Sequence, residues 1–204
     1  MASASDVTTI LEIDEKSVER IGTRPPKPIE IVDYNPEWPA RFAGLEQRIR
    51  NALGDRVVAV QHVGSTSVPG LPAKDVMDID LVVADPTNEE SYVPDLQAAG
   101  FTFILREPKW YQHRLFSLLE PYTNLHVFGP DSPEWVRHRL FRDWLREHED
   151  DRERYTAVKR EAAGVSAAAG ENVQQYNERK EPVIRDILQR IFEAHGLLDS
   201  SAST

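Results

Sequence analysis

The chain contains no cysteine among its 204 residues, which excludes disulfide bonds and thiolate metal sites. This absence is typical of an intracellular protein, and we expect a cytoplasmic location. No apolar run approaches the roughly 18 residues that a membrane span needs. The polar start of the chain, residues 1–6, also lacks the apolar core of a signal peptide. We therefore expect no membrane association.

Positive charge is in short supply, because 24 Lys and Arg residues face 34 Asp and Glu residues and leave a net charge of −10. This balance disfavours broad nonspecific binding to DNA or RNA, which depends on neutralising phosphates. It remains compatible with a local basic patch. With 40% hydrophobic and 28% charged residues, the composition is ordinary for a soluble globular protein.

Four segments divide the chain. Residues 1–28 are polar and end in the proline-rich stretch RPPKP, which predicts a flexible leader with a short helix between residues 7 and 21. Residues 29–130 alternate between strand and helix patterns, and residues 131–198 are helical. Residues 199–204 are predicted to form a disordered tail. The expected fold is α+β, a small mixed sheet with flanking helices and a C-terminal helical cap that borders a ligand cleft.

Local patterns place the individual elements. The predicted strands cover residues 29–32, 56–62, 79–84, 101–105, 114–119 and 125–128. The predicted helices cover residues 35–53 and 89–99, a stretch that opens at 132, and residues 151–169 and 171–195. Pro182 is expected to kink or restart the last helix.

Two carboxylates on one strand are the most informative feature. Asp78 and Asp80 are two residues apart in an apolar strand, so their side chains share one face of the sheet. Adjacent carboxylates repel unless a cation joins them, which predicts a divalent metal site. Upstream, Gly64, Ser65 and Thr66 form a turn whose N–H groups and hydroxyls suit phosphate oxygens. The alternative is a strand end with two solvated carboxylates.

The stretch HVGSTSVPGLPAK at residues 62–74, followed by VMDID at 76–80, closely resembles the signature of the GrpB family. Shorter matches follow at NLHV (124–127) and FRDWLR (141–146), and the resemblance covers roughly residues 29–195. That family resembles a branch of the nucleotidyltransferase superfamily with the DNA polymerase β-type fold. The resemblance implies such a fold here and leaves the substrate open.

The resemblance also gives a role to His126. Nucleotidyltransferases of this fold carry a third carboxylate on a neighbouring strand, and the family's motif puts His126 at that place. An imidazole there could complete a metal site with Asp78 and Asp80, or act as a general base near neutral pH. The alternative is a core histidine with a satisfied hydrogen bond.

Cationic and phenolic side chains later in the chain are candidates for holding a polyphosphate. Tyr155 and Lys159 are four residues apart on a predicted helix, and Tyr176 and Lys180 repeat that spacing. Spacing alone fits a solvated helix face equally well, whereas the family resemblance favours the functional interpretation. Further candidates are Lys74 after the glycine-rich loop and Arg142 in the FRDWLR motif.

Together these features predict a transferase that uses Mg²⁺ or Mn²⁺ to move a nucleotidyl group from a nucleoside triphosphate to a small acceptor. An acyl or aminoacyl transferase on the same scaffold is an alternative, with an activated donor such as aminoacyl-tRNA and with Ser65 or His126 in covalent or general-base roles. A non-catalytic nucleotide-binding module is a third hypothesis. Fold alone does not decide among them.

Overall fold

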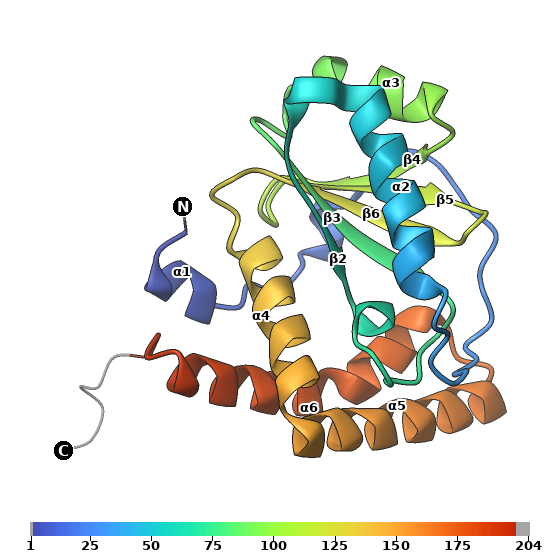
Figure 1. The fold of residues 1–204 in the computed structure, drawn as a ribbon, viewed down its shortest axis with the longest axis vertical. Helices are drawn as coiled ribbons and strands as arrows, with labels where there is room; N and C mark the ends of the chain where they lie inside the picture. Colours follow the sequence, from blue (N-terminus) through green and yellow to red (C-terminus); the bar gives the residue numbers. More distant parts are fainter. Residues whose placement is uncertain (1, 199–204) are drawn as a thin grey trace.

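A mixed β-sheet forms the centre of the computed structural model, which describes residues 2–198 (Figure 1). Six strands follow the order β1-β4-β5-β6-β3-β2. Their bounds are β1 Glu19–Arg20, β2 Val57–Val63, β3 Met77–Val83, β4 Thr102–Glu107, β5 His113–Leu118 and β6 Thr123–Phe128. Only β3 and β6 pair in parallel within this sheet, and the other pairs are antiparallel. The mixed sheet with flanking helices confirms the predicted fold class.

Strand β3 decides which face of the sheet is the core and which carries polar chemistry. Its alternate residues Met77, Ile79 and Leu81 are buried in the main hydrophobic cluster. They pack with residues of α2 (Trp38–Leu53) and α3 (Val93–Ala98), which cover that face. Because side chains alternate along a strand, Asp78 and Asp80 emerge on the opposite face. Their placement on one face was predicted from the two-residue spacing.

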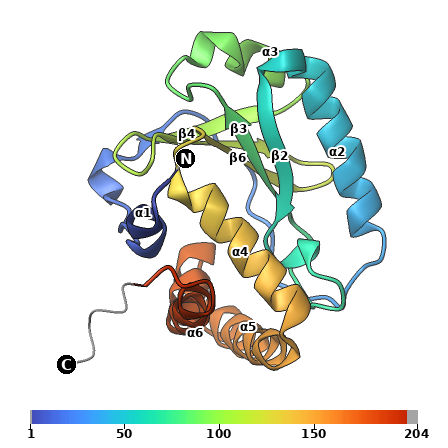
Figure 2. The same cartoon turned by 60° about the vertical axis from the view of Figure 1, so that its left-hand side comes forward.

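The opposite face is closed by three helices, α4 Pro133–Glu147, α5 Glu149–Ala169 and α6 Val173–Ala194 (Figure 2). Ser132 caps α4 by accepting a hydrogen bond from the Glu134 backbone, and Asn172 forms a capping box at the start of α6. A second hydrophobic cluster joins these helices through Leu145, Tyr155 and Ile187, among others. Helix α6 continues through Pro182 without interruption, so the expected restart does not occur.

Two predicted elements are smaller than expected. The strand predicted over residues 29–32 is reduced to a single bridge between Val32 and Ala73. The helix predicted over residues 89–99 is divided into a 3-10 turn, Glu89–Ser91, and the short helix α3. Tyr92 lies between them outside helical geometry, with its ring fully buried and its hydroxyl donating to the Pro86 carbonyl. Burial of that aromatic ring fixes the break.

Residues 2–28 pack on the body and do not form the flexible leader that was expected for the N-terminal segment. Helix α1 (Ala4–Thr8) buries Val7 in the helical cluster, and β1 pairs with β4 at the edge of the sheet. Arg137 of α4 is only 3% exposed and donates to the backbone carbonyls of Asp6, Val7 and Thr9. One buried valine and one arginine on another element are not visible in the local composition. The tail predicted for residues 199–204 lies outside the described residues.

Removing residues 2–10 should therefore lower the free energy of unfolding by about 2–4 kcal/mol. The deletion exposes apolar surface around Val7 and leaves the buried guanidinium of Arg137 without its carbonyl acceptors. Urea unfolding of the truncated and full chains measures the difference. An unchanged unfolding midpoint would show that this packing contributes nothing to stability. Within residues 2–198, no helix is long and apolar enough to cross a membrane.

Candidate functional site

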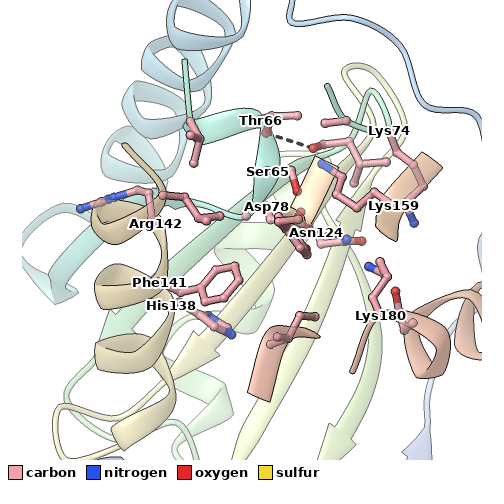
Figure 3. Close-up of a pocket in the computed structure, with 18 of the residues that line it drawn as sticks. Ser65, Thr66, Lys74, Asp78, Asn124, His138, Phe141, Arg142, Lys159 and Lys180 are labelled. Carbon is pink, nitrogen blue, oxygen red and sulfur yellow. Dashed lines mark hydrogen bonds between the residues drawn. The ribbon is translucent and has the colours of Figure 1, made fainter. Parts of the chain in front are cut away.

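A cavity of about 480 Å³ lies between the polar face of the sheet and the helical cap (Figure 3). Its walls come from the loop after β2, from β3 and β6, and from α4, α5 and α6. The predicted residues that line it are Gly64, Ser65, Thr66, Lys74, Asp78, His126, Arg142, Tyr155, Lys159, Tyr176 and Lys180. The structure thus gathers residues that are more than 100 positions apart in the chain around one space. Asp80 is the one predicted site residue that does not line it.

The Gly-Ser loop is packed tightly against Asp78. Gly64 has a φ of 66°, and a Cβ at this position would stand 2.5 Å from Asp78 Oδ2, so only glycine fits. Thr66 is 1% exposed and its hydroxyl donates to the Val76 carbonyl, which makes that hydroxyl part of the loop structure. Ser65 lines the cavity near Tyr155. Burial raises the pKa of Tyr155 to about 12, so its phenol stays neutral.

The two strand carboxylates have different surroundings. Asp78 lines the cavity, and burial raises its pKa while the hydrogen bond from Asn124 Nδ2, at 2.7 Å, opposes the rise. Asp80 is fully buried and accepts hydrogen bonds from His138 Nδ1 and Gln61 Nε2, each at 3.0 Å. Asp78 is therefore the carboxylate that a bound ligand can meet, whereas Asp80 ties β3 to α4.

Within residues 2–198, no group of three or more His, Cys, Asp or Glu side chains is placed to hold a metal ion. Asp78, Asp80 and His126 share one face of the sheet, because β3 and β6 pair Asp80 with His126. They do not, however, converge as a ready ligand set. A metal here would need oxygen ligands from its substrate, which is how Mg²⁺ is commonly held in phosphate sites.

Three lysines surround the cavity from three elements (Figure 3). Lys159 is 2% exposed and donates to the Pro72 carbonyl, and Lys180 is 8% exposed and lies 4.2 Å from the centre of the Tyr176 ring. Lys74 contacts the same ring at 5.0 Å. Burial and the neighbouring lysines lower the pKa of Lys159 and of Lys180 to about 7. Among the described residues none of the three lysines forms an ion pair with a carboxylate.

The other predicted phosphate ligands are engaged elsewhere. The Arg142 guanidinium points away from Asp78 in Figure 3 and pairs with Asp143 at 2.7 Å, while its Nη1 donates to the His62 carbonyl. Tyr155 and Tyr176 present ring faces to the lysine ammonium groups, 5.1 Å from Lys159 in the case of Tyr155. The tyrosines thus support the lysines, and Arg142 links α4 to the end of β2.

Several residues of the site were not predicted from the sequence. His138 Nδ1 lies 3.0 Å from the Asp80 carboxylate. Burial is the largest single effect and lowers the pKa of His138, but the charge and hydrogen bond of Asp80 together with the charges of Glu134 and Asp78 raise it to about 9. Arg24 donates to Asn124 Oδ1 at 2.5 Å and lines the cavity from the N-terminal segment. Asn124 could have been found, because it stands two residues before His126 in the NLHV motif and so shares its face. The contributions of Arg24 and His138 depend on tertiary packing alone.

The geometry defines an α+β protein with a cation-lined cavity between its sheet and a helical cap. The profile of the GrpB protein family matches residues 28–190, and the chain belongs to this family. A UPF0157 protein of Halalkalibacterium halodurans is 44% identical over 162 residues, covering 79% of this chain and 82% of that protein. A UPF0157 protein of Streptomyces coelicolor is 38% identical over 177 residues, covering 87% and 91% of the two chains.

Two further similarities concern the fold and a longer protein. The crystal structure of the conserved protein GrpB from Enterococcus faecalis superposes with a TM-score of 0.68 at 21% identity, covering 82% of this chain and 99% of that one, which shows the shared fold. A protein of Mycolicibacterium paratuberculosis named dephospho-CoA kinase is 31% identical over 192 residues. That match covers 81% of this chain and 46% of the kinase.

Proposed function

We propose that the cavity binds the polyphosphate of a nucleoside triphosphate, and that the protein transfers the nucleotidyl group to a small acceptor. The observation that carries this proposal is a set of three lysines, Lys74, Lys159 and Lys180, that form no ion pair with a carboxylate of residues 2–198. Buried charges in proteins are normally paired, because leaving water costs them several kcal/mol. Within residues 2–198 the carboxylates that line the cavity are Asp78, Glu134 and Glu181. Arg137 pairs with Glu134 and Arg185 pairs with Glu181, so the lysines exceed the unpaired negative charge there.

A triphosphate matches this excess in charge and in chemistry. Lysine ammonium groups donate charge-assisted hydrogen bonds to phosphate oxygens, and such bonds are stronger than neutral ones. A bound polyanion also restores the ordinary protonated state of Lys159 and Lys180, whose pKa values lie near 7 without it. The relative from Mycolicibacterium paratuberculosis, of which the match covers 46%, is named dephospho-CoA kinase, a name that agrees with a phosphate-bearing ligand.

Asp78 is the proposed protein ligand for Mg²⁺ or Mn²⁺. Mg²⁺ in phosphate sites is typically bound through one or two carboxylates together with substrate oxygens and water, which fits a single free carboxylate. The ion would supply charge neutralisation on the transferring phosphate. Asn124 and Gly64 hold the Asp78 side chain in place, and His126 at the cavity wall is the proposed proton acceptor for the attacking group.

Nucleotide binding without turnover is a second candidate function. It is favoured by one observation, namely that no cluster of three metal-binding side chains is preformed among the described residues. The two candidates differ in a simple assay. Incubation with nucleoside triphosphates, Mg²⁺ and a panel of cell metabolites should release pyrophosphate and yield mass-shifted products if the protein is a transferase, whereas a binding module returns both reactants unchanged.

Binding of a triphosphate should be coupled to proton uptake. At pH 8 the buried amines of Lys159 and Lys180, with pKa values of about 7, are mostly neutral, and a bound polyanion favours their charged form. Calorimetry with a non-hydrolysable triphosphate in two buffers of different ionisation enthalpy measures the uptake, which should approach one proton or more per nucleotide. Equal affinity for nucleoside and triphosphate, without proton uptake, would refute the polyphosphate site.

A further inference from the structure

A chain of hydrogen bonds leads from the cavity wall into the closed interior. His126 Nδ1 lies 3.0 Å from His113 Nε2, and His113 Nδ1 lies 2.5 Å from Glu107 Oε2. The strands β4, β5 and β6 bring these three residues together, with Glu107 and His113 directly paired across β4 and β5. Glu107 and His113 are 7% and 3% exposed, so neither reaches a ligand directly.

The order of the three groups fixes where their protons lie. An ionised carboxylate can only accept hydrogen bonds, so Glu107 requires a proton on His113 Nδ1. The neutral His113 ring then carries its lone pair on Nε2 and accepts from His126 Nδ1–H. His126 consequently has no proton on Nε2. The Glu107 carboxylate, acting through His113, thereby selects one tautomer of His126 at the cavity wall.

The unprotonated nitrogen of His126 is directed into the cavity. His126 lines that space, and no group in residues 2–198 hydrogen-bonds its Nε2. In the same part of the chain no buried side-chain nitrogen or oxygen lacks a partner. Since Nε2 has no partner within residues 2–198, it keeps some accessible surface although most of the ring is buried, and the cavity that His126 lines is the space that this surface meets. A ligand in the cavity therefore meets a lone pair.

We propose that Glu107 and His113 are positioning residues that present the bare Nε2 of His126 to the attacking group, an inference that rests on the proposed nucleotidyl transfer. The acceptor's O–H bond breaks and its proton binds Nε2, while the oxygen keeps the electron pair and bonds to the α-phosphorus as pyrophosphate leaves. The Nδ1 proton of His126 passes to His113 Nε2, and that of His113 Nδ1 passes to Glu107. Both imidazoles remain neutral, and Glu107 holds the proton until it returns by the same path.

The surroundings of the three side chains favour the Glu107 carboxyl group as the one that holds the proton at the end of the transfer. Burial lowers the pKa of His113 and of His126 to about 3, which disfavours an imidazolium at either position. Burial also raises the pKa of Glu107, so its neutral form is less costly than that of an exposed glutamate. The charged and titratable groups that act on the three residues are Arg20, Arg24, Asp80, Arg114 and His138.

Glu107→Gln tests the chain, because an amide neither takes up the proton nor enforces one tautomer. We expect turnover to fall by roughly 10²–10⁴-fold, the range associated with general-base catalysis and with loss of a tautomer-setting carboxylate. The Kd for a non-hydrolysable triphosphate should change less than twofold, because Glu107 does not line the cavity. Glu90→Gln, at an exposed position, is the matched control and should turn over normally.

The tautomer is measured independently of activity by the ¹⁵N chemical shifts of the His126 ring. The unchanged protein should show a protonated Nδ1 and an unprotonated Nε2, and Glu107→Gln should show a mixture of both tautomers. A protonated Nε2 in the unchanged protein would overturn the inference even if the variant fails to fold. Normal turnover in a folded Glu107→Gln protein would overturn it as well. Complete absence of transfer with the expected tautomer would refute the proposed function and, with it, the catalytic use of the chain.

Discussion

Replacing His138 with alanine is expected to destabilise the protein by about 3–5 kcal/mol, the cost of leaving a fully buried carboxylate without its charged partner. Asp80 is fully buried, and His138 Nδ1 is 3.0 Å from both of its oxygens. Without the imidazolium, the Asp80 carboxylate keeps, within residues 2–198, only the hydrogen bond from Gln61 Nε2 and loses its cationic partner. Urea unfolding at pH 7 measures the loss.

His195→Ala is a suitable control, because that imidazole is exposed and, within residues 2–198, makes only a local hydrogen bond to the Ile191 carbonyl. Its free energy of unfolding should stay within about 0.5 kcal/mol of the unchanged protein, as for most surface substitutions. A His138→Ala protein as stable as this control would show that Asp80 does not depend on its partner.

The same pair predicts a pH dependence with a definite sign. The pKa of His138 is raised to about 9 in the folded protein, above its usual value of 6.5, so its contribution is complete below pH 6.5 and is lost as the pH rises through 9. Lys159 and Lys180 act in the opposite direction over this range, because folding lowers their pKa values to about 7. Both lysines are present in the unchanged protein and in His138→Ala, so their contribution drops out of the difference in free energy of unfolding between the two. This difference should shrink between pH 6.5 and 9.

Alternation along β3 explains why the sequence predicted much of the site. Two carboxylates between Met77, Ile79 and Leu81 can only emerge together on the polar face, whatever surrounds them. The pattern could not distinguish their roles, since Asp80 is taken up by His138, which stands 58 positions later on a helix. The lysines of α5 and α6 were identified from family resemblance, whereas their burial comes from the packing of these two helices on each other and against Ile29 and Ile31.

The N-terminal segment shows the limit of composition as a guide. Its polar residues and its RPPKP stretch suggested a free leader, and yet Arg24 in that stretch reaches the cavity through Asn124. The contact joins positions 100 residues apart, so nothing in the local sequence marks it. The Glu107–His113–His126 chain could not be predicted from the sequence for the same reason. Its members belong to three strands whose order in the sheet is set by the fold.

Replacing Lys159 and Lys180 together with methionine is expected to weaken triphosphate binding by roughly 10²–10⁴-fold. Each charge-assisted hydrogen bond to phosphate contributes about 1.5–3 kcal/mol, so two of them account for a loss of that size. Adenosine, which has no phosphate, should bind the variant as it binds the unchanged protein. Calorimetry with both ligands separates loss of phosphate recognition from damage to the helical cap. Arg160→Met, an exposed cation beside Lys159 on α5, is the matched control.

The stability of the Lys180→Met protein provides a second test, in which the expected change is opposite in direction to the change in affinity. Lys180 makes no hydrogen bond within residues 2–198 and its ammonium lies 4.2 Å from the centre of the Tyr176 ring, so a methionine of similar length removes a buried charge at little structural cost. Lys180→Met alone should therefore leave the ligand-free protein as stable as before or more stable by about 1 kcal/mol. If Lys180 had a structural role, its replacement would instead lower both the free energy of unfolding of the protein and its affinity for adenosine. Stability gained while triphosphate affinity is lost is the result expected of a cation held in place for an anionic ligand.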